Sequence, residues 1–336
     1  MQTGGILESL LPVIARSCFA LFGHLVSPRL SVLIFHRVHA QTDSIFPHEP
    51  DAARFEFLMR FVARSFQVMT LGEAVTCLAR GDLPPRALVI TFDDGYADNA
   101  EIALPILQRT GLRASFFVSS GFLDGGRMWN DSVIESLRAC RLAEVDLESF
   151  GLGRRALASP AERRQVIEAL LPRIKYLTLA EREQEIARLK NLCGVSDLPA
   201  NLMMSSAQVQ ELHRVGMEIG AHTVNHPILT TLAPSEAESE IAEGRRQLES
   251  IISAPVDMFA FPNGKPGRDY DHSHVLMLKR LGFRGAVSTA PGVSRSGNDL
   301  FQLPRFTPWD DSLGTWAMRL LLNQRNIRFE TTVTGE

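Results

Sequence analysis

Short apolar runs alternate with longer amphipathic stretches along the chain from residue 30 onward. The short runs are continuously apolar, which is typical of strands buried on both faces of a parallel sheet. The longer stretches repeat their apolar residues at helical spacing, as Phe55, Leu58 and Val62 do. Strands are expected over 31–35, 87–92, 114–118, 217–221, 258–261 and 285–288, and helices over 54–65, 71–80, 97–109 and 235–252.

Repeated strand–helix–strand units imply a parallel sheet, open or closed into a barrel. One segment departs from this alternation, because residues 130–207 show helical patterns, best at 162–171 and 179–192, and no convincing strand. We interpret it as a helical insertion, either a solvated decoration or a lid that covers the site and binds part of the substrate. The predicted parts are an N-terminal helical segment (1–30), the parent fold (31–129 and 208–308), the insertion (130–207) and a C-terminal helix with a tail (309–336).

The N-terminal segment is apolar but interrupted by charges. Its longest uncharged stretch, 17–28, is too short to span a bilayer core of about 30 Å. The first charged side chain is Glu8, so the basic start of a signal peptide is missing. The alternatives are a packed helix, a helix that lies on a membrane surface through residues 6–30, and a targeting signal. We expect a cytoplasmic or membrane-associated protein.

Composition narrows the classes of function. The 336 residues are 45% hydrophobic and 22% charged, which suffices for a buried core and argues against disorder. A net charge of −3 gives no electrostatic basis for binding nucleic acid. The cysteines (Cys18, Cys77, Cys140 and Cys193) form no C-x-x-C pair, which excludes a disulfide framework and a thiolate zinc finger. A metal must therefore be held by histidine and carboxylate.

Two adjacent carboxylates follow the expected strand 87–92, within the sequence Thr-Phe-Asp-Asp-Gly-Tyr. Asp93 and Asp94 should point in different directions, so that one can ligate a metal while the other faces the substrate. Because two carboxylates this close repel each other, a cation or hydrogen-bond donor should lie nearby. The alternative is an ordinary Asp-Asp-Gly surface turn, for which Gly95 supplies the permissive backbone.

A His-Thr-Val-Asn-His-Pro sequence follows the expected strand 217–221. His222 and His226 can meet one ion if the segment makes a single helical turn, and the alternative is two unrelated loop histidines. Both clusters follow parallel strands, whose carboxyl ends gather active sites in α/β folds. Together with Asp94, the histidines would form a site for a divalent metal, with zinc as the first choice.

The pair Thr-Phe-Asp-Asp-Gly-Tyr and His-Thr-x-x-His-Pro resembles the first two motifs of the polysaccharide deacetylase (NodB-homology) family, carbohydrate esterase family four. The likeness extends over about residues 30–125 and 203–308. It implies a distorted (β/α) barrel of about seven parallel strands, and metal-dependent release of acetate from N-acetylated sugars of the N-acetylglucosamine type in a polysaccharide or oligosaccharide. It assigns the catalytic base to Asp93 and the metal ligands to Asp94, His222 and His226.

Residues 261–264, Phe-Pro-Asn-Gly, resemble the family's third motif, where Pro-Tyr-Gly is common. Asn263 replaces the aromatic residue, but its backbone N–H would still serve the oxyanion because a backbone donor does not depend on the side chain. The arginine usual before this motif is missing. Arg305 is the expected partner of Asp93, and the alternative for Arg305 is a surface salt bridge.

The general acid departs further from the family pattern. No Leu-x-His motif follows Arg305, whereas a branch that deacetylates exopolysaccharide ends an N-terminal strand in an aromatic-His pair, as this chain does at Phe35 and His36. We expect His36 to be the acid because imidazole, with a reference pKa of about 6.5, donates at neutral pH. Alternatively, His36 caps the strand and packs under the site. Tyr96 and Trp129 could offer stacking faces to a sugar ring or belong to the core.

Other functions stay open on the sequence alone. A same-fold amidohydrolase could act on a small N-acyl compound, and a non-catalytic carbohydrate-binding or assembly protein could retain the fold. A membrane-surface assembly factor would use residues 6–30 and 316–327. The expected partner is an N-acetylated saccharide, without nucleic acid, and any membrane contact should run through residues 6–30.

Overall fold

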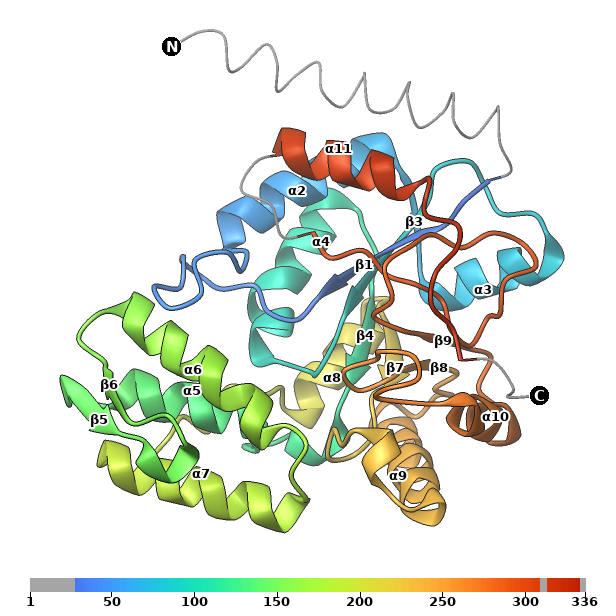
Figure 1. The fold of residues 1–336 in the computed structure, drawn as a ribbon. Helices are drawn as coiled ribbons and strands as arrows, with labels where there is room; N and C mark the ends of the chain where they lie inside the picture. Colours follow the sequence, from blue (N-terminus) through green and yellow to red (C-terminus); the bar gives the residue numbers. More distant parts are fainter. Residues whose placement is uncertain (1–27, 309–312, 333–336) are drawn as a thin grey trace, which may run out of the picture.

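Seven strands form one curled sheet in the computed structural model, which describes residues 28–308 and 313–332 (Figure 1). The strands are β1 (Ser31–Phe35), β2 (Gln67–Met69), β3 (Ala87–Phe92), β4 (Ser115–Val118), β7 (Glu218–Ala221), β8 (Met258–Ala260) and β9 (Gly285–Val287). They pair in the order β1-β3-β4-β7-β8-β9, and β2 pairs with the start of β3. Every pairing in this sheet is parallel.

A short segment, 303–306, joins the two edges of the sheet. Leu303 exchanges two backbone hydrogen bonds with β9 and the residue that follows it, and Phe306 exchanges two with β1. Both edges are therefore covered, and the sheet closes into a distorted barrel. The expected fold class is confirmed.

Helices cover the outside of the barrel and one of its ends (Figure 1). They are α2 (Ala52–Ser65), α3 (Leu71–Arg80), α4 (Leu104–Thr110), α8 (Ser206–Arg214), α9 (Pro234–Ile252), α10 (His272–Arg280) and α11 (Leu313–Asn323). α2 packs against α4, and α9 packs against α8 and β7. The Trp316 ring of α11 contacts Phe61 of α2 edge-on, with 5.5 Å between the ring centroids. The C-terminal helix thus belongs to the layer of helices around the sheet.

Alternate residues of β3 face opposite sides, and both sides are buried. Ile90 packs in a large apolar cluster with the surrounding helices, whereas Val89 packs in a second cluster formed by the barrel interior and α3. Burial on both faces explains the continuously apolar run in the sequence. Thr91 and Asp93 continue the series of Val89, so they face the barrel interior at its carboxyl end.

Residues 130–207 form a lobe beside the barrel, drawn in green in Figure 1. The helices and strands of this lobe are α5 (Trp129–Ala139), β5 (Glu144–Asp146), β6 (Arg154–Ala156), α6 (Pro160–Ile174) and α7 (Leu179–Cys193). Their buried side chains form a separate apolar cluster, which Ile45 joins from the loop before α2. The expectation of helices without a strand is wrong, because β5 and β6 pair antiparallel. Strands of three residues are too short to give a periodic signal. The four-part division of the chain stays a prediction.

The structure departs from the sequence expectations at β2 and in the stretch 97–109 as well. β2 was not expected, and the helix over 97–109 is a π-helical turn, Asn99–Ala103, followed by α4. Pro105 lacks an N–H, so an unbroken α-helical ladder cannot run through this stretch. The alternatives for the N-terminal segment fall on residues 1–27, which lie outside the described residues. Within the described ranges, no helix combines the length and apolar character needed to cross a membrane.

Candidate functional site

Asp93 and Asp94 leave the end of β3 at a sharp backbone turn. Asp94 has a φ of 76° and Gly95 a φ of 93°. A Cβ on Gly95 would lie 2.9 Å from the Val118 side chain in β4, so both space and backbone conformation require glycine here. Both carboxylates are buried. The Asp-Asp-Gly sequence is therefore an interior feature at the carboxyl end of the sheet and not a surface turn.

Arg305 holds the Asp93 carboxylate through two hydrogen bonds. Its Nη1 and Nη2 donate to Oδ1 and Oδ2 of Asp93, each at 2.7 Å, and its Nε donates to the Ser288 carbonyl at 2.8 Å. Both side chains are buried, which excludes the surface salt bridge weighed for Arg305. Burial raises the pKa of Asp93, but the charge and hydrogen bonds of Arg305, together with the nearby charges of His222 and His36, outweigh burial and keep this pKa below its ordinary value. Asp93 is thus held ionised and in one orientation.

Asp94, His222 and His226 bring three ligand-type atoms together. The Nε2 atoms of the two histidines each lie 3.4 Å from Oδ1 of Asp94, and all three atoms lie within 4.8 Å of one another. In a tetrahedral zinc site with bonds of about 2.0–2.1 Å, neighbouring ligand atoms are separated by about 3.3 Å. The spacing therefore suits one divalent cation. In the part of the chain that the structure describes, this is the only cluster of three such residues at this spacing.

The loop that carries the histidines is not the helical turn that the sequence predicts. Thr223 and His226 have φ values of 65° and 50°, outside the right-handed helical region. Glu240 of α9 holds the loop by accepting hydrogen bonds from two of its backbone N–H groups, and the Thr223 hydroxyl accepts one from the His226 N–H. Backbone strain of this kind costs about 1–3 kcal/mol per residue and persists only where the surroundings impose it. Packing against α9 therefore brings the two rings together.

Each of the two imidazoles presents its Nε2 atom to Asp94. His222 Nδ1 lies 2.7 Å from the Ala260 carbonyl, which assigns the proton to Nδ1 and leaves Nε2 as the ligand atom. Burial lowers the pKa of His226 to about 3, so this ring is neutral. Burial also opposes charge on His222, but its hydrogen bond with Asp94 and the charges of Asp93 and Asp94 together outweigh burial and raise its pKa. The buried Asp94 carboxylate thus stabilises a positive charge beside it, and a metal cation can supply that charge.

A cavity of about 680 Å³ opens beside the cluster. Asp93, Asp94 and both histidines line it, so a substrate could reach the base and the ligands together. Trp129 is half-buried in its wall, with the Arg182 guanidinium 4.9 Å from the ring centroid. The insertion also contributes to this wall, which favours its role as a cap over a solvated decoration. Its residues there are Asn130, Leu171, Pro172, Lys175 and Tyr176.

Asn263 lines the same cavity from the loop after β8. Its φ is 58°, and the Thr289 hydroxyl donates to its carbonyl at 2.8 Å. Its backbone N–H donates to no other described residue. A backbone donor without a partner at the cavity wall has the character that an oxyanion donor requires.

His36 directly follows β1 and also lines the cavity. Its carbonyl accepts a hydrogen bond from the Asn99 side chain at 2.8 Å, while its ring makes no hydrogen bond to a described residue. Its charge acts on the pKa of both Asp93 and Asp94, so the ring lies close to them. His274 instead caps the start of α10, with its Nδ1 2.8 Å from Asp271. His36 is therefore the better-placed imidazole for proton donation.

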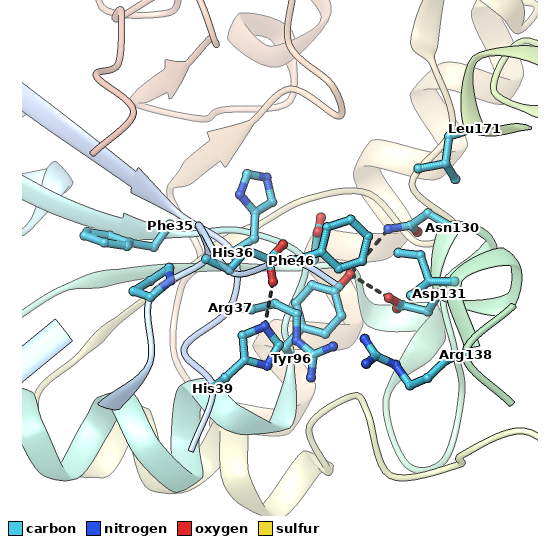
Figure 2. Close-up of a pocket in the computed structure, with 14 residues that line it drawn as sticks. Phe35, His36, Arg37, His39, Phe46, Tyr96, Asn130, Asp131, Arg138 and Leu171 are labelled. Carbon is cyan, nitrogen blue, oxygen red and sulfur yellow. Dashed lines mark hydrogen bonds and ion pairs between the residues drawn. The ribbon is translucent and has the colours of Figure 1, made fainter. Parts of the chain in front are cut away.

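A second cavity, of about 240 Å³, shares His36 and Asp94 with the first (Figure 2). Tyr96 donates a hydrogen bond from its hydroxyl to Asp131 at 3.2 Å, and the Arg37 guanidinium lies 4.7 Å from the centroid of the Tyr96 ring. The ring is buried and its face is occupied, which does not suit the stacking role considered for Tyr96. Tyr96 instead supports the wall beside Asp94.

Asp131 has an unusual environment in this second cavity. It is buried, and its Oδ2 has no hydrogen-bond partner. Burial raises its pKa to about 7, although Arg37 acts in the opposite direction. A carboxyl group with a raised pKa stabilises the fold below its unfolded pKa of about 3.9, and this contribution is lost as the pH rises through the folded value.

We therefore expect Asp131→Asn to be more stable than the wild type at alkaline pH in metal-free protein. Between about pH 4 and about pH 7, the difference in the free energy of unfolding should grow by up to about 1.4 kcal/mol per pH unit, and above about pH 7 it should stay constant. Urea unfolding of both proteins across this pH range measures it. If the free energies of unfolding of the two proteins differ by the same amount at every pH, burial does not raise the pKa of Asp131.

Sequence analysis missed several residues that build the site. Glu240 holds the histidine loop, the Ala260 carbonyl orients His222, and Asp131 and Arg37 surround Tyr96. Each belongs to an ordinary helix, strand or loop pattern, so no local signal distinguishes it. Their roles depend on contacts between segments far apart in the chain.

Comparison with protein families gives one match over more than half of the chain. The family model described as polysaccharide deacetylase matches residues 80–171 and 179–286. The match runs through most of the segment 130–207, whereas the sequence motifs indicated a likeness on either side of it. The family resemblance inferred from the motifs is confirmed.

Individual relatives are distant. YxkH of Bacillus subtilis (strain 168), which carries a provisional polysaccharide deacetylase name, is 19% identical over 278 residues, 82% of this chain and 70% of YxkH. The deacetylase PplD of Streptococcus pyogenes, solved in complex with acetate, superposes with a TM-score of 0.58 at 17% identity, over 88% of this chain and 97% of PplD. IcaB of Ammonifex degensii superposes with a TM-score of 0.56 at 18% identity, over 88% of this chain and 97% of IcaB. At these identities the solved structures support the fold.

Proposed function

The chain belongs to the polysaccharide deacetylase family, a family of hydrolases that act on amide carbon–nitrogen bonds, and on this premise we propose that it removes acetyl groups from N-acetylated sugars with a divalent metal. N-acetylglucosamine-type units are the proposed substrate, and acetate and a free amino sugar the products. The observation that carries the proposal is the convergence of Asp94, His222 and His226 beside Asp93 in one cavity. Family membership argues against the non-catalytic alternative.

The donor set fits a divalent cation. Two imidazole nitrogens and one carboxylate oxygen suit zinc first, and their spacing fits tetrahedral coordination. His226 Nδ1 is buried without a partner, so this ring is available for ligation through Nε2 without breaking another contact. When bound, such a cation would polarise an acetyl carbonyl and lower the pKa of water toward about 7.

Groups of the protein itself would carry out the proton transfers and bind the oxyanion. Asp93, oriented by Arg305, accepts the proton of the water that attacks the acetamide carbon. The Asn263 N–H donates to the developing oxyanion, a contribution of about 3–4 kcal/mol in related chemistry. His36 donates a proton to the leaving nitrogen as the carbon–nitrogen bond breaks.

The test is acetate release from N-acetylglucosamine oligomers before and after metal removal. Chelator-treated protein is expected to be inactive and to recover with one equivalent of Zn²⁺ or another divalent cation per chain. His226→Ala should lose both the cation and the activity, whereas His213→Ala, a histidine of α8 that does not line the cavity, should keep both. Acetate release that resists the chelator would contradict the metal, and no release by the zinc-loaded chain would contradict the proposed reaction.

A further inference from the structure

Three cationic side chains line the cavity beyond the metal cluster: Lys175, Lys265 and Arg268. Lys175 follows α6 in the insertion, and the other two lie in the loop between β8 and α10 that also carries Asn263. The two segments are distant in sequence and face the same space. The chain as a whole is slightly acidic, with a net charge of −3, so this gathering of positive charge is local.

These charges are not balanced by the carboxylates around them. Within the described ranges, none of the three forms an ion pair with a carboxylate. The other charges of the cavity are already matched, because Asp93 pairs with Arg305, and Asp94 belongs to the candidate metal cluster. Asp269 is the one acidic neighbour whose charge acts on Lys175. Three cations against one carboxylate leave a positive excess at the cavity wall.

The cations are close enough to influence one another. Burial lowers the pKa of Lys175; Asp269 opposes this, and the charges of Lys265 and Arg268 reinforce the lowering. Lys175 Nζ and Arg268 Cζ lie 5.6 Å and 5.0 Å from the centroid of the Tyr176 ring. An anion bound among them would relieve their mutual repulsion. It would also gain charge-assisted hydrogen bonds from the half-buried Lys175 and the exposed Lys265 and Arg268.

We propose that the preferred substrate is an acidic saccharide, in which the N-acetylated sugar carries a carboxylate or a phosphate that Lys175, Lys265 and Arg268 bind while the acetamide reaches the metal cluster. The inference rests on the proposed function, since it identifies the substrate class of that same site. The insertion then contributes to specificity, because Lys175 belongs to it. A neutral sugar would leave the three charges without a partner.

The experiment compares three substrates for the zinc-loaded full chain: an N-acetylglucosamine disaccharide, a disaccharide of N-acetylglucosamine and a uronic acid, and a phosphorylated N-acetylglucosamine disaccharide. We expect kcat/KM to be at least about tenfold higher for the acidic substrates, and added salt to reduce the advantage. The carboxylate and phosphate arms show which anion is preferred. Calorimetric binding of the same sugars to metal-free chain gives a readout that does not require catalysis.

The double variant Lys265→Gln/Arg268→Gln is expected to raise KM for the acidic substrates by about tenfold or more. Its kcat, and its KM for the neutral substrate, should change little. Arg141→Gln/Arg155→Gln is the matched control, since it removes two exposed charges that do not line the cavity. Equal kcat/KM for neutral and acidic sugars, or equal effects of both double variants, would overturn the inference and leave the deacetylase proposal standing. No acetate from any of the three sugars overturns both.

Discussion

Replacing Asp93 with asparagine is expected to lower acetate release by about 10²–10⁴-fold while leaving one divalent cation bound per chain. Asparagine keeps the shape of the side chain but cannot accept a proton from water. The candidate ligands Asp94, His222 and His226 are unchanged, so the cation should remain. Acetate release and metal content are measured on the same preparation, with circular dichroism to show that the chain is folded.

Asp94→Asn is the matched control, because it makes the same chemical change one residue along the chain. It should lose the cation and the activity together, since Oδ1 of Asp94 is the atom that both imidazoles face at 3.4 Å. The two variants thus separate the base from the ligand. Turnover of Asp93→Asn close to that of the wild type would remove Asp93 from the mechanism.

Replacing Arg305 with methionine is expected to destabilise the protein by about 3–5 kcal/mol, the usual cost of leaving one partner of a buried ion pair without the other. The Asp93 carboxylate would keep its place in the interior without its two hydrogen bonds from Arg305. Denaturant unfolding of metal-free protein measures the loss. The double variant Asp93→Asn/Arg305→Met should recover part of it, since no buried charge is then left unpaired.

The pH dependence of this loss gives an independent check. In the wild type, the lowered pKa of Asp93 means that its contribution to stability is present above the unfolded pKa of about 3.9 and is lost as the pH falls through the folded value. In Arg305→Met, burial acts without the opposing charge and raises this pKa, so the variant loses stability as the pH rises. The gap between the two proteins should therefore widen as the pH rises above the unfolded pKa of about 3.9. A constant difference in the free energy of unfolding would mean that the loss of Arg305 does not change the pKa of Asp93.

The strands and the two motif clusters could be predicted from sequence because their signals are local. A continuously apolar run such as 87–92 reports burial on both faces, and the adjacent carboxylates at its end report a site at the carboxyl edge of the sheet. The motifs then indicated the family. Weak local signals failed: the three-residue strands β5 and β6 are shorter than any recognisable period, and the π-helical turn before α4 has the same apolar spacing as an ordinary helix.

By itself, the sequence determined the fold class, the family and which side chains are candidates for chemistry, since each rests on neighbouring residues. Only the tertiary structure decided how those side chains meet. Arg305 reaches Asp93 across 212 positions, the histidine loop takes a strained shape against α9, and cations from the insertion and the β8–α10 loop line one cavity. The physical reason is that burial, charge pairing and strain arise from contacts between distant segments, and these contacts exist only once the chain has folded.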